Sequence, residues 1–192
     1  MGNRQHVPSF FAQDDFKVTP KLTLNLGVRY EYFSPLVEVN DKQSNFDYQA
    51  AQVIPAGRNG ASRGLVDADH LNLAPRIGLA YNPAGQTVLR AAYGIFYSGQ
   101  EIRTAAPLQL AYNVPFYTQP FFVSDGITPV LTVDQRFPPV DPLNAVDPPV
   151  TSVDTRLKPP YYQQWNFAIQ QGLPSAVSVE LAYAGSKGTH LQ

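Results

Sequence analysis

The sequence predicts an all-β protein, an antiparallel up-and-down transmembrane β-barrel segment with about six strands in three hairpins and two long extracellular loops. Apolar and polar residues alternate with a period of two over several stretches, which is the spacing of a strand with one apolar face. Short turns and long connections follow one another strictly along the chain, as they do in outer-membrane barrels. Composition agrees, because charged residues make up only 15% of the chain while the apolar fraction is an ordinary 44%.

The first hairpin, at about residues 8–33, contains the clearest strand. From Lys21 to Tyr32 every even position is apolar or aromatic, whereas the odd positions are polar or glycine. Helical spacing would scatter these apolar residues around the axis, so the pattern predicts a strand. The preceding stretch, Ser9 to Val18, alternates in the same way except at Asp14, and Thr19-Pro20 supplies the turn between the two strands.

Two more hairpins are predicted at about residues 73–98 and 161–184. In the second hairpin, two alternating stretches flank a turn at residues 82–86, which contain proline and glycine. In the third, the turn is predicted at residues 172–175, and a further polar loop is expected to begin at residues 185–190.

Two long connections, at about residues 34–72 and 99–160, are predicted to be extracellular loops without regular ladders. The second contains eleven prolines, which remove ladder hydrogen bonds. Compact soluble domains rarely contain two such loops, so the loops favour a barrel over an ordinary sandwich. With no shift in composition to divide it, residues 1–192 are treated as one partial β-barrel domain.

Aromatic residues lie in the strand halves nearest the long loops, as a girdle at the membrane interface requires. The predicted membrane-interface aromatics are Tyr30, Tyr32, Tyr97, Tyr161, Trp165 and Tyr183, with Phe33, Phe96 and Tyr162 in the same halves. The competing interpretation is that aromatic residues favour strands in any protein. The one-sided placement favours the girdle.

The opposite face of the strands is predicted to line a lumen. Its polar and charged residues are Arg29, Glu31, Arg76, Arg90, Gln164, Asn166 and Glu180. Glycine recurs on this face in three similar segments, where a crowded or sharply curved inner wall would need a small residue. The charged residues could guide a ligand or hold a plug, although charged side chains in a barrel wall more often pair with neighbouring strands.

Enzymatic chemistry is not expected. The chain has no cysteine, its three histidines are far apart, and no serine lies in a strand-to-helix elbow. Residues 67–70 (Asp-Ala-Asp-His) lack the other positions of a calcium loop, and residues 185–189 (Gly-Ser-Lys-Gly-Thr) lack the glycine spacing of a phosphate-binding loop. We therefore predict no catalytic residue, metal or cofactor. A net charge of −1 without a basic run also argues against a nucleic-acid partner.

Six strands cannot close a single-chain barrel, which needs at least about eight. An open sheet would leave backbone groups at its edges unsatisfied in lipid. The chain is therefore expected to be a fragment of a larger barrel in the cell outer membrane, with lipid and the remaining barrel strands as its partners. Residues 1–6 lack the apolar run of a signal peptide, so an export signal is expected upstream.

Residues 11–31 (FAQDDFKVTPKLTLNLGVRYE) closely resemble a strand-turn-strand signature of TonB-dependent outer-membrane receptors, particularly the Oar-like kind that carries a carboxypeptidase-regulatory-like domain. Residues 74–81, 163–167 and 182–191 resemble later hairpins of that barrel. The resemblance implies a barrel of about 22 strands with a plug domain in its lumen. It also implies uptake of a scarce siderophore, vitamin or glycan, driven by the TonB complex through the plug. This chain lacks the plug and the TonB-contacting segment of such receptors.

Two alternatives remain open at this point. A soluble β-rich module that binds a carbohydrate or another ligand through its loop aromatics would need no lipid, but it leaves the alternating loop lengths unexplained. An enzyme would require a site hidden in the proline-rich loop.

Overall fold

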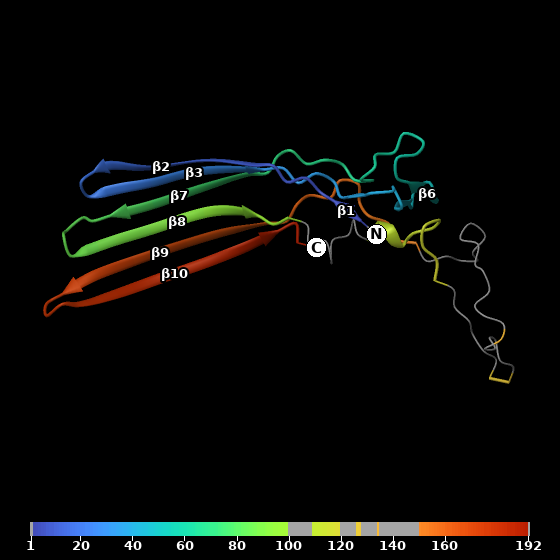
Figure 1. Cartoon of the computed structure of the whole chain (residues 1–192). Helices are drawn as coiled ribbons and strands as arrows, with labels where there is room; N and C mark the ends of the chain where they lie inside the picture. The colour runs from blue at the N-terminus through green and yellow to red at the C-terminus, as the bar shows by residue number, and fades with distance from the viewer. Residues whose placement is uncertain (1, 100–108, 120–125, 128–133, 135–149, 192) are drawn as a thin grey trace. The chain divides into compact units, whose positions relative to one another are not determined.

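The computed structural model describes residues 2–99, 109–119, 126–127, 134 and 150–191 (Figure 1). The chain divides into two compact units. The sheet unit comprises residues 6–34, 68–101 and 158–192, and the loop unit comprises residues 1–5, 35–67 and 102–157. Among the described residues, no helix is long and apolar enough to cross a membrane.

The sheet unit consists of one six-stranded sheet in the order β10-β9-β8-β7-β3-β2, with every neighbouring pair antiparallel (Figure 1). Its strands are β2 (Ser9–Thr19), β3 (Leu22–Glu31), β7 (Leu73–Tyr81), β8 (Thr87–Tyr97), β9 (Tyr161–Leu173) and β10 (Val177–Thr189). Sequence neighbours pair throughout, so the sheet is an up-and-down meander. The predicted fold class is confirmed in its strands and their antiparallel connection.

The register of the ladders gathers most of the apolar residues of the six strands on one face. Residues opposite each other in an antiparallel ladder point to the same side. One row across the middle of this apolar face, here named the central row, contains Asp14, Leu26, Ile77, Tyr93, Trp165 and Gly185. The adjacent row on the polar face contains Gln13, Gly27, Arg76, Gly94, Gln164 and Ser186.

Two boundaries differ from the prediction. β9 runs to Leu173, so the turn lies later than predicted, with Ser175 and Ala176 at positive φ. β10 runs to Thr189, and the prediction of a polar loop from Gly185 was wrong. Small and polar residues continue the ladder there because its bonds join main-chain groups.

The connections also contain more structure than predicted. Residues 34–72 include β4 (Val37–Glu38), β5 (Ser44–Asp47) and β6 (Gln52–Pro55), and β4 pairs with β1 (Asn3–Arg4). A short 3-10 helix, η1 (Leu110–Tyr112), lies in the second connection. The prediction of two structureless loops was therefore wrong for these segments. Most of the proline-rich stretch lies outside the described residues.

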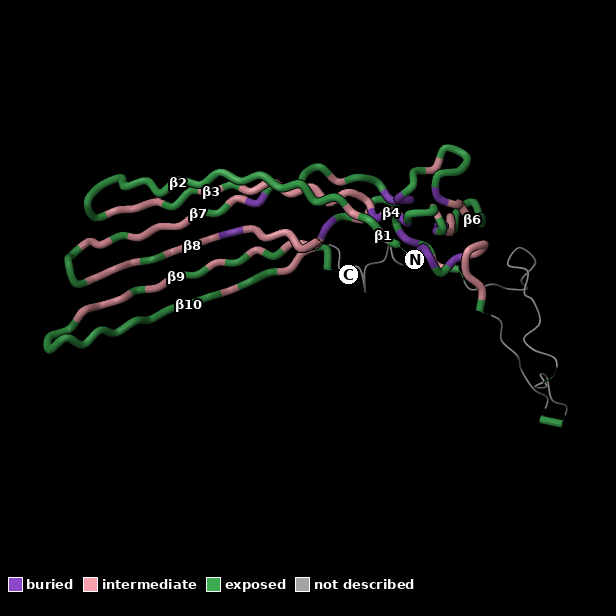
Figure 2. Tube along the Cα trace, viewed as in Figure 1, coloured by how far each residue is buried: buried purple, intermediate pink, exposed green. Residues whose placement is uncertain are grey.

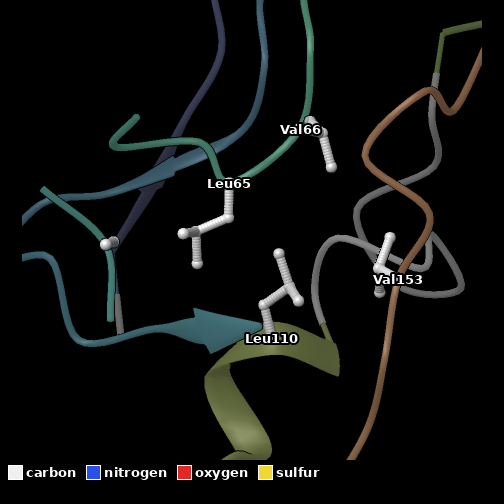
Figure 3. Packing of buried hydrophobic residues seen from close by; sticks show 5 residues of the cluster. Leu65, Val66, Leu110 and Val153 are labelled. Carbon is white, nitrogen blue, oxygen red and sulfur yellow. The ribbon is translucent and has the colours of Figure 1, made fainter. Parts of the chain in front are cut away.

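The loop unit has a small apolar core. Leu65, Val66, Leu110 and Val153 converge in it from three separate segments (Figure 3), and Ala56 adds a fourth. Leu110 is the most deeply buried member, with 0% of its surface exposed. This core ties η1 to the first long connection and to the segment after residue 150.

Buried polar side chains hold the loop unit together around this core. Asn45 donates to the carbonyl of Val153 over 2.8 Å and accepts from its N–H over 2.9 Å. Asn113 donates to the carbonyls of Ser44 and Thr151 and accepts from the Thr151 N–H. These amides bridge main chains that belong to no common ladder, so they replace the missing secondary structure.

Burial differs sharply between the units (Figure 2). In the six strands of the sheet, only Ala74 and Gly94 are buried, and every residue of β2 is exposed. Apolar side chains on the apolar face stand open, with Leu181 75% exposed and Phe10 69% exposed. The sheet therefore presents a broad apolar surface that the described residues do not cover.

Candidate functional site

The polar face of the sheet contains a groove of about 350 Å³ that spans β2, β3, β7, β8 and β9. Its polar lining residues are Gln13, Asn25, Arg76, Gln164 and Asn166. Its small lining residues are Gly27, Gly78, Ala92 and Gly94. Four neutral amides and one guanidinium therefore meet over a floor that has almost no side chains.

The glycines of the floor are explained by close approach of neighbouring side chains. A Cβ atom at Gly78 would lie 3.1 Å from the Asn25 side-chain oxygen, and one at Gly94 would lie 2.9 Å from the Phe96 ring. A larger residue at either position would displace the side chain above it and fill the groove. The glycine that recurs on the polar face thus makes room for the side chains of neighbouring strands.

Arg76 is the cation of the groove. Its guanidinium carbon lies 4.7 Å from the centroid of the Phe96 ring, a cation–π arrangement. Arg76 has no hydrogen bond or ion pair with any residue that the structure describes. Its donors are therefore available to an anionic or hydroxyl-rich group in the groove.

All seven residues predicted to line a lumen lie on this polar face. Two of the predicted charges form an ion pair within β3, where Arg29 Nε lies 2.9 Å from Glu31 Oε1. Arg90 lies 4.0 Å from Glu180, although β9 separates their strands. Arg90 therefore has an acidic neighbour, whereas Arg76 contacts the Phe96 ring. That this face lines a lumen stays a prediction.

The predicted interface aromatics do not all lie on one face of the sheet. Tyr30, Tyr97, Tyr161, Trp165 and Tyr183 lie on the apolar face. Tyr32 follows the end of β3 and stacks on His70, with ring centroids 4.7 Å apart. Phe96 and Tyr162 pair with each other on the polar face, so they cannot belong to a girdle on the apolar side. The membrane-interface role of the others stays a prediction.

Several groove residues could not be identified from the sequence alone. Gln13 and Asn25 line the groove, but neither was selected, because their polarity is ordinary for an alternating strand. The signal that could have identified them is the repeated glycine, since Gly27 pairs with Gln13 and Gly78 pairs with Asn25. The register was needed to make that connection.

A second cavity, of about 580 Å³, lies in the loop unit. It is lined by residues 45–49 and 54 of the β5–β6 hairpin and by residues 152–156. The reciprocal Asn45–Val153 hydrogen bonds hold these two segments together. Tyr48 is 73% exposed at this cavity and offers an aromatic face and a hydroxyl group.

The described residues contain no group of three or more metal-ligating side chains. In the Asp-Ala-Asp-His segment, Asp69 forms an isolated bridge with Phe33, and its side chain accepts from the Leu71 N–H. Residues 185–189 form the end of β10 and present no loop to a phosphate. The groove is thus the most developed polar site in the sheet unit.

A family model described as an outer membrane beta barrel domain matches residues 1–192. The match includes both the sheet unit and the loop unit. No curated protein and no solved structure matches the chain significantly.

Proposed function

The chain belongs to the outer membrane beta barrel domain family, and from this premise we propose that it forms part of the wall of a TonB-dependent receptor. Its place is the cell outer membrane. In this proposal the receptor takes up a scarce ligand of the siderophore, vitamin or glycan class. The polar face lines the passage and the apolar face meets lipid.

The segregation of the two faces carries this proposal. Each interior strand has an uncharged apolar face, while the opposite face holds the groove, the arginines and the amides. A polar interior and an apolar exterior are the pattern of barrels wide enough to enclose a channel or a plug. The resemblance of residues 11–31 to a receptor signature supports uptake in particular.

Membership of the family favours this proposal over a soluble binding module. In water, the apolar face would leave several aromatic and aliphatic side chains open to solvent, including Leu181 and Phe10. In an outer membrane, lipid covers that face without any further protein layer.

The loop unit has a part in the proposed uptake. Its cavity is within the size range of small-molecule sites, and its walls are fixed by buried hydrogen bonds. We assign it a contact with the ligand. In this scheme the chain catalyses no reaction and needs no cofactor, and its partners are lipid, the remaining strands, a plug and the TonB complex.

Single-cysteine labelling tests the orientation of the faces. The chain has no cysteine, so each introduced thiol reports on one position alone. Asn166 lines the groove, whereas its neighbour Phe167 lies on the apolar face. In intact cells, a water-soluble, membrane-impermeant maleimide should label Asn166→Cys and leave Phe167→Cys unlabelled. Equal labelling of both would contradict the orientation.

An uptake assay tests transport. Cells that lack the protein should lose uptake of at least one compound in a panel of ferric chelates, vitamins and oligosaccharides. A protonophore should abolish the same uptake in unmodified cells, because TonB draws on the energised inner membrane. Arg76→Gln should lower uptake several-fold at equal protein abundance, while Lys17→Gln, on the same face outside the groove, should not. Uptake insensitive to the protonophore would exclude TonB.

A further inference from the structure

The apolar face of the sheet carries charge only on its two edge strands. Along the four interior strands, all of which are described, the positions on this face hold apolar, aromatic or uncharged polar residues. On β2 the register places Asp14 there, and on β10 it places Lys187. Opposite charges thus mark the two edges of an otherwise neutral surface.

Asp14 has no side-chain partner within the described part of the chain. It lies in the central row, midway along β2, opposite Leu26 and between Ala12 and Phe16. Its side chain makes no hydrogen bond or ion pair with any residue that the structure describes. The neighbouring Asp15 points to the other face, where its carboxylate accepts from Asn25 Nδ2 over 2.5 Å.

Lys187 and Asp14 differ in whether their charged groups can reach water at the membrane interface. Lys187 is two residues from the end of β10, and its long aliphatic stem can carry the ammonium to the interface. Asp14 is in the middle of its strand and has one methylene group, so it cannot reach water. A carboxylate at this depth is costly, and a cation beside it offsets that cost.

That cation has to come from the free side of β2. On the other side β3 presents only Leu24, Leu26 and Val28 near Asp14. Among the described strands β2 pairs only with β3, so the N–H and C=O groups along its outer edge have no ladder partner there. A strand inside a bilayer needs partners for those groups, so another strand must lie along this edge.

We infer that the strand completing the sheet at β2 carries a lysine or arginine on its lipid-facing side, level with Asp14, and that the two form an ion pair. This inference rests on the membrane-wall part of the proposed function and is independent of uptake. The pair would fix the register of the joint, because a slip of two residues would move the cation away from the carboxylate.

Geometry excludes a second copy of this chain as the source of the cation. If copies formed a ring, pairing Asp14 of one copy with Lys187 of the next would place Phe16 opposite Gly185. From one copy to the next, the central row would then be displaced along the strands by two residues, about 7 Å. The six strands of one copy span about 29 Å across the sheet. The resulting tilt of about 13° is far below the roughly 35–45° of membrane barrels.

Thermal unfolding of the protein purified from outer membranes in detergent tests the pair. Ala12→Leu is the matched control, because Ala12 lies on the same face of the same strand. It should raise the unfolding midpoint by about 2 °C if the face meets lipid. Asp14→Leu should instead lower the midpoint by about 5 °C, since it leaves the partner cation unpaired.

The unfolding midpoint of Asp14→Glu should stay near that of the unmodified protein. The midpoint of Asp14→Asn should be lowered, as in Asp14→Leu. If Asp14→Leu fails to accumulate, a several-fold greater yield of Asp14→Glu than of Asp14→Asn in outer membranes supports the pair, and equal yields overturn it. A higher unfolding midpoint in Asp14→Leu would mean that Asp14 is unpaired. This result overturns the inference and leaves the proposed function intact. A lower unfolding midpoint in Ala12→Leu would mean that this face does not meet lipid. This result overturns both the inference and the proposed function.

Discussion

The sheet unit and the loop unit are stabilised in opposite ways. The strands of the sheet are joined by long regular ladders, yet among their residues only Ala74 and Gly94 are buried. In its described residues the loop unit has only short strands, yet it buries an apolar cluster and several polar side chains, among them Gln43, Asn45 and Asn113. Regular backbone pairing and side-chain burial are thus separated along one chain.

The difference follows from the surroundings of each unit. In a bilayer every backbone group must be paired within the protein, whereas apolar side chains are covered by lipid at no cost. Loops in water can leave backbone groups to the solvent, but they need an interior of their own to hold one shape. The sheet unit therefore pairs its backbone groups internally, and the loop unit buries its own apolar and polar side chains.

The largest effect is expected in the core of the loop unit. Leu110→Ala should destabilise this unit by about 4 kcal/mol, because it removes a fully buried side chain that joins four segments. Hydrogen exchange should accelerate in peptides from residues 36–66 and stay unchanged in peptides from β3 and β9. Equal acceleration in the sheet would mean that the two units unfold together.

The next effect tests the apolar face. Ile77→Arg places a charge in the central row and should cost about 3 kcal/mol in a membrane. Ala184→Arg, at a similar height on the polar face, is the control and should cost little. Folded protein recovered from outer membranes measures both variants. Similar losses would remove the distinction between the faces.

Asn113→Ala should have a somewhat smaller effect, about 2 kcal/mol, confined to the loop unit. The substitution leaves the Thr151 N–H and the carbonyls of Ser44 and Thr151 without the hydrogen bonds that Asn113 supplies. Asn166→Ala is the matched control in the sheet, since Asn166 lines the open groove and bridges no main chain that the structure describes. Protease resistance of the loop unit should fall only in the first variant.

The smallest effect concerns pH. The N–H groups of Lys42, Asn40 and Gly2 donate to the buried Glu38 carboxylate and hold its pKa below the ordinary 4.5, although burial opposes them. The lowered pKa adds stability that is complete above pH 4.5 and is lost as the pH falls through the folded-state value. Glu38→Gln should flatten this acid dependence of hydrogen exchange in the loop unit. An unchanged profile would assign the acid sensitivity to other carboxylates.

Much of the sheet could be predicted from the sequence. The alternation from Lys21 to Tyr32 is a local property, because successive side chains of any strand point to opposite faces. It placed the predicted lumen residues on one face without knowledge of their partners. The end of β10 escaped prediction because Gly185 and Ser186 carry no apolar pattern and belong to the strand through their main-chain pairing with β9.

The loop unit could not be predicted in the same way. Asn45 and Asn113 look like ordinary loop residues, and only contacts with Val153 and Thr151 turn them into buried bridges. Leu110 stands in a segment without periodicity, so nothing near it in the sequence predicts burial. Such roles depend on segments that are distant along the chain.

The sequence by itself thus determined the strands, their two faces and the class of the fold, since period-two patterning is local. Only the tertiary structure decided the register, and with it the groove over Gly78 and Gly94 and the isolation of Asp14 from the described residues. The physical reason is that a ladder can shift by two residues without exchanging its faces. Pattern therefore fixes which side a residue faces, while neighbouring strands decide which residues it meets.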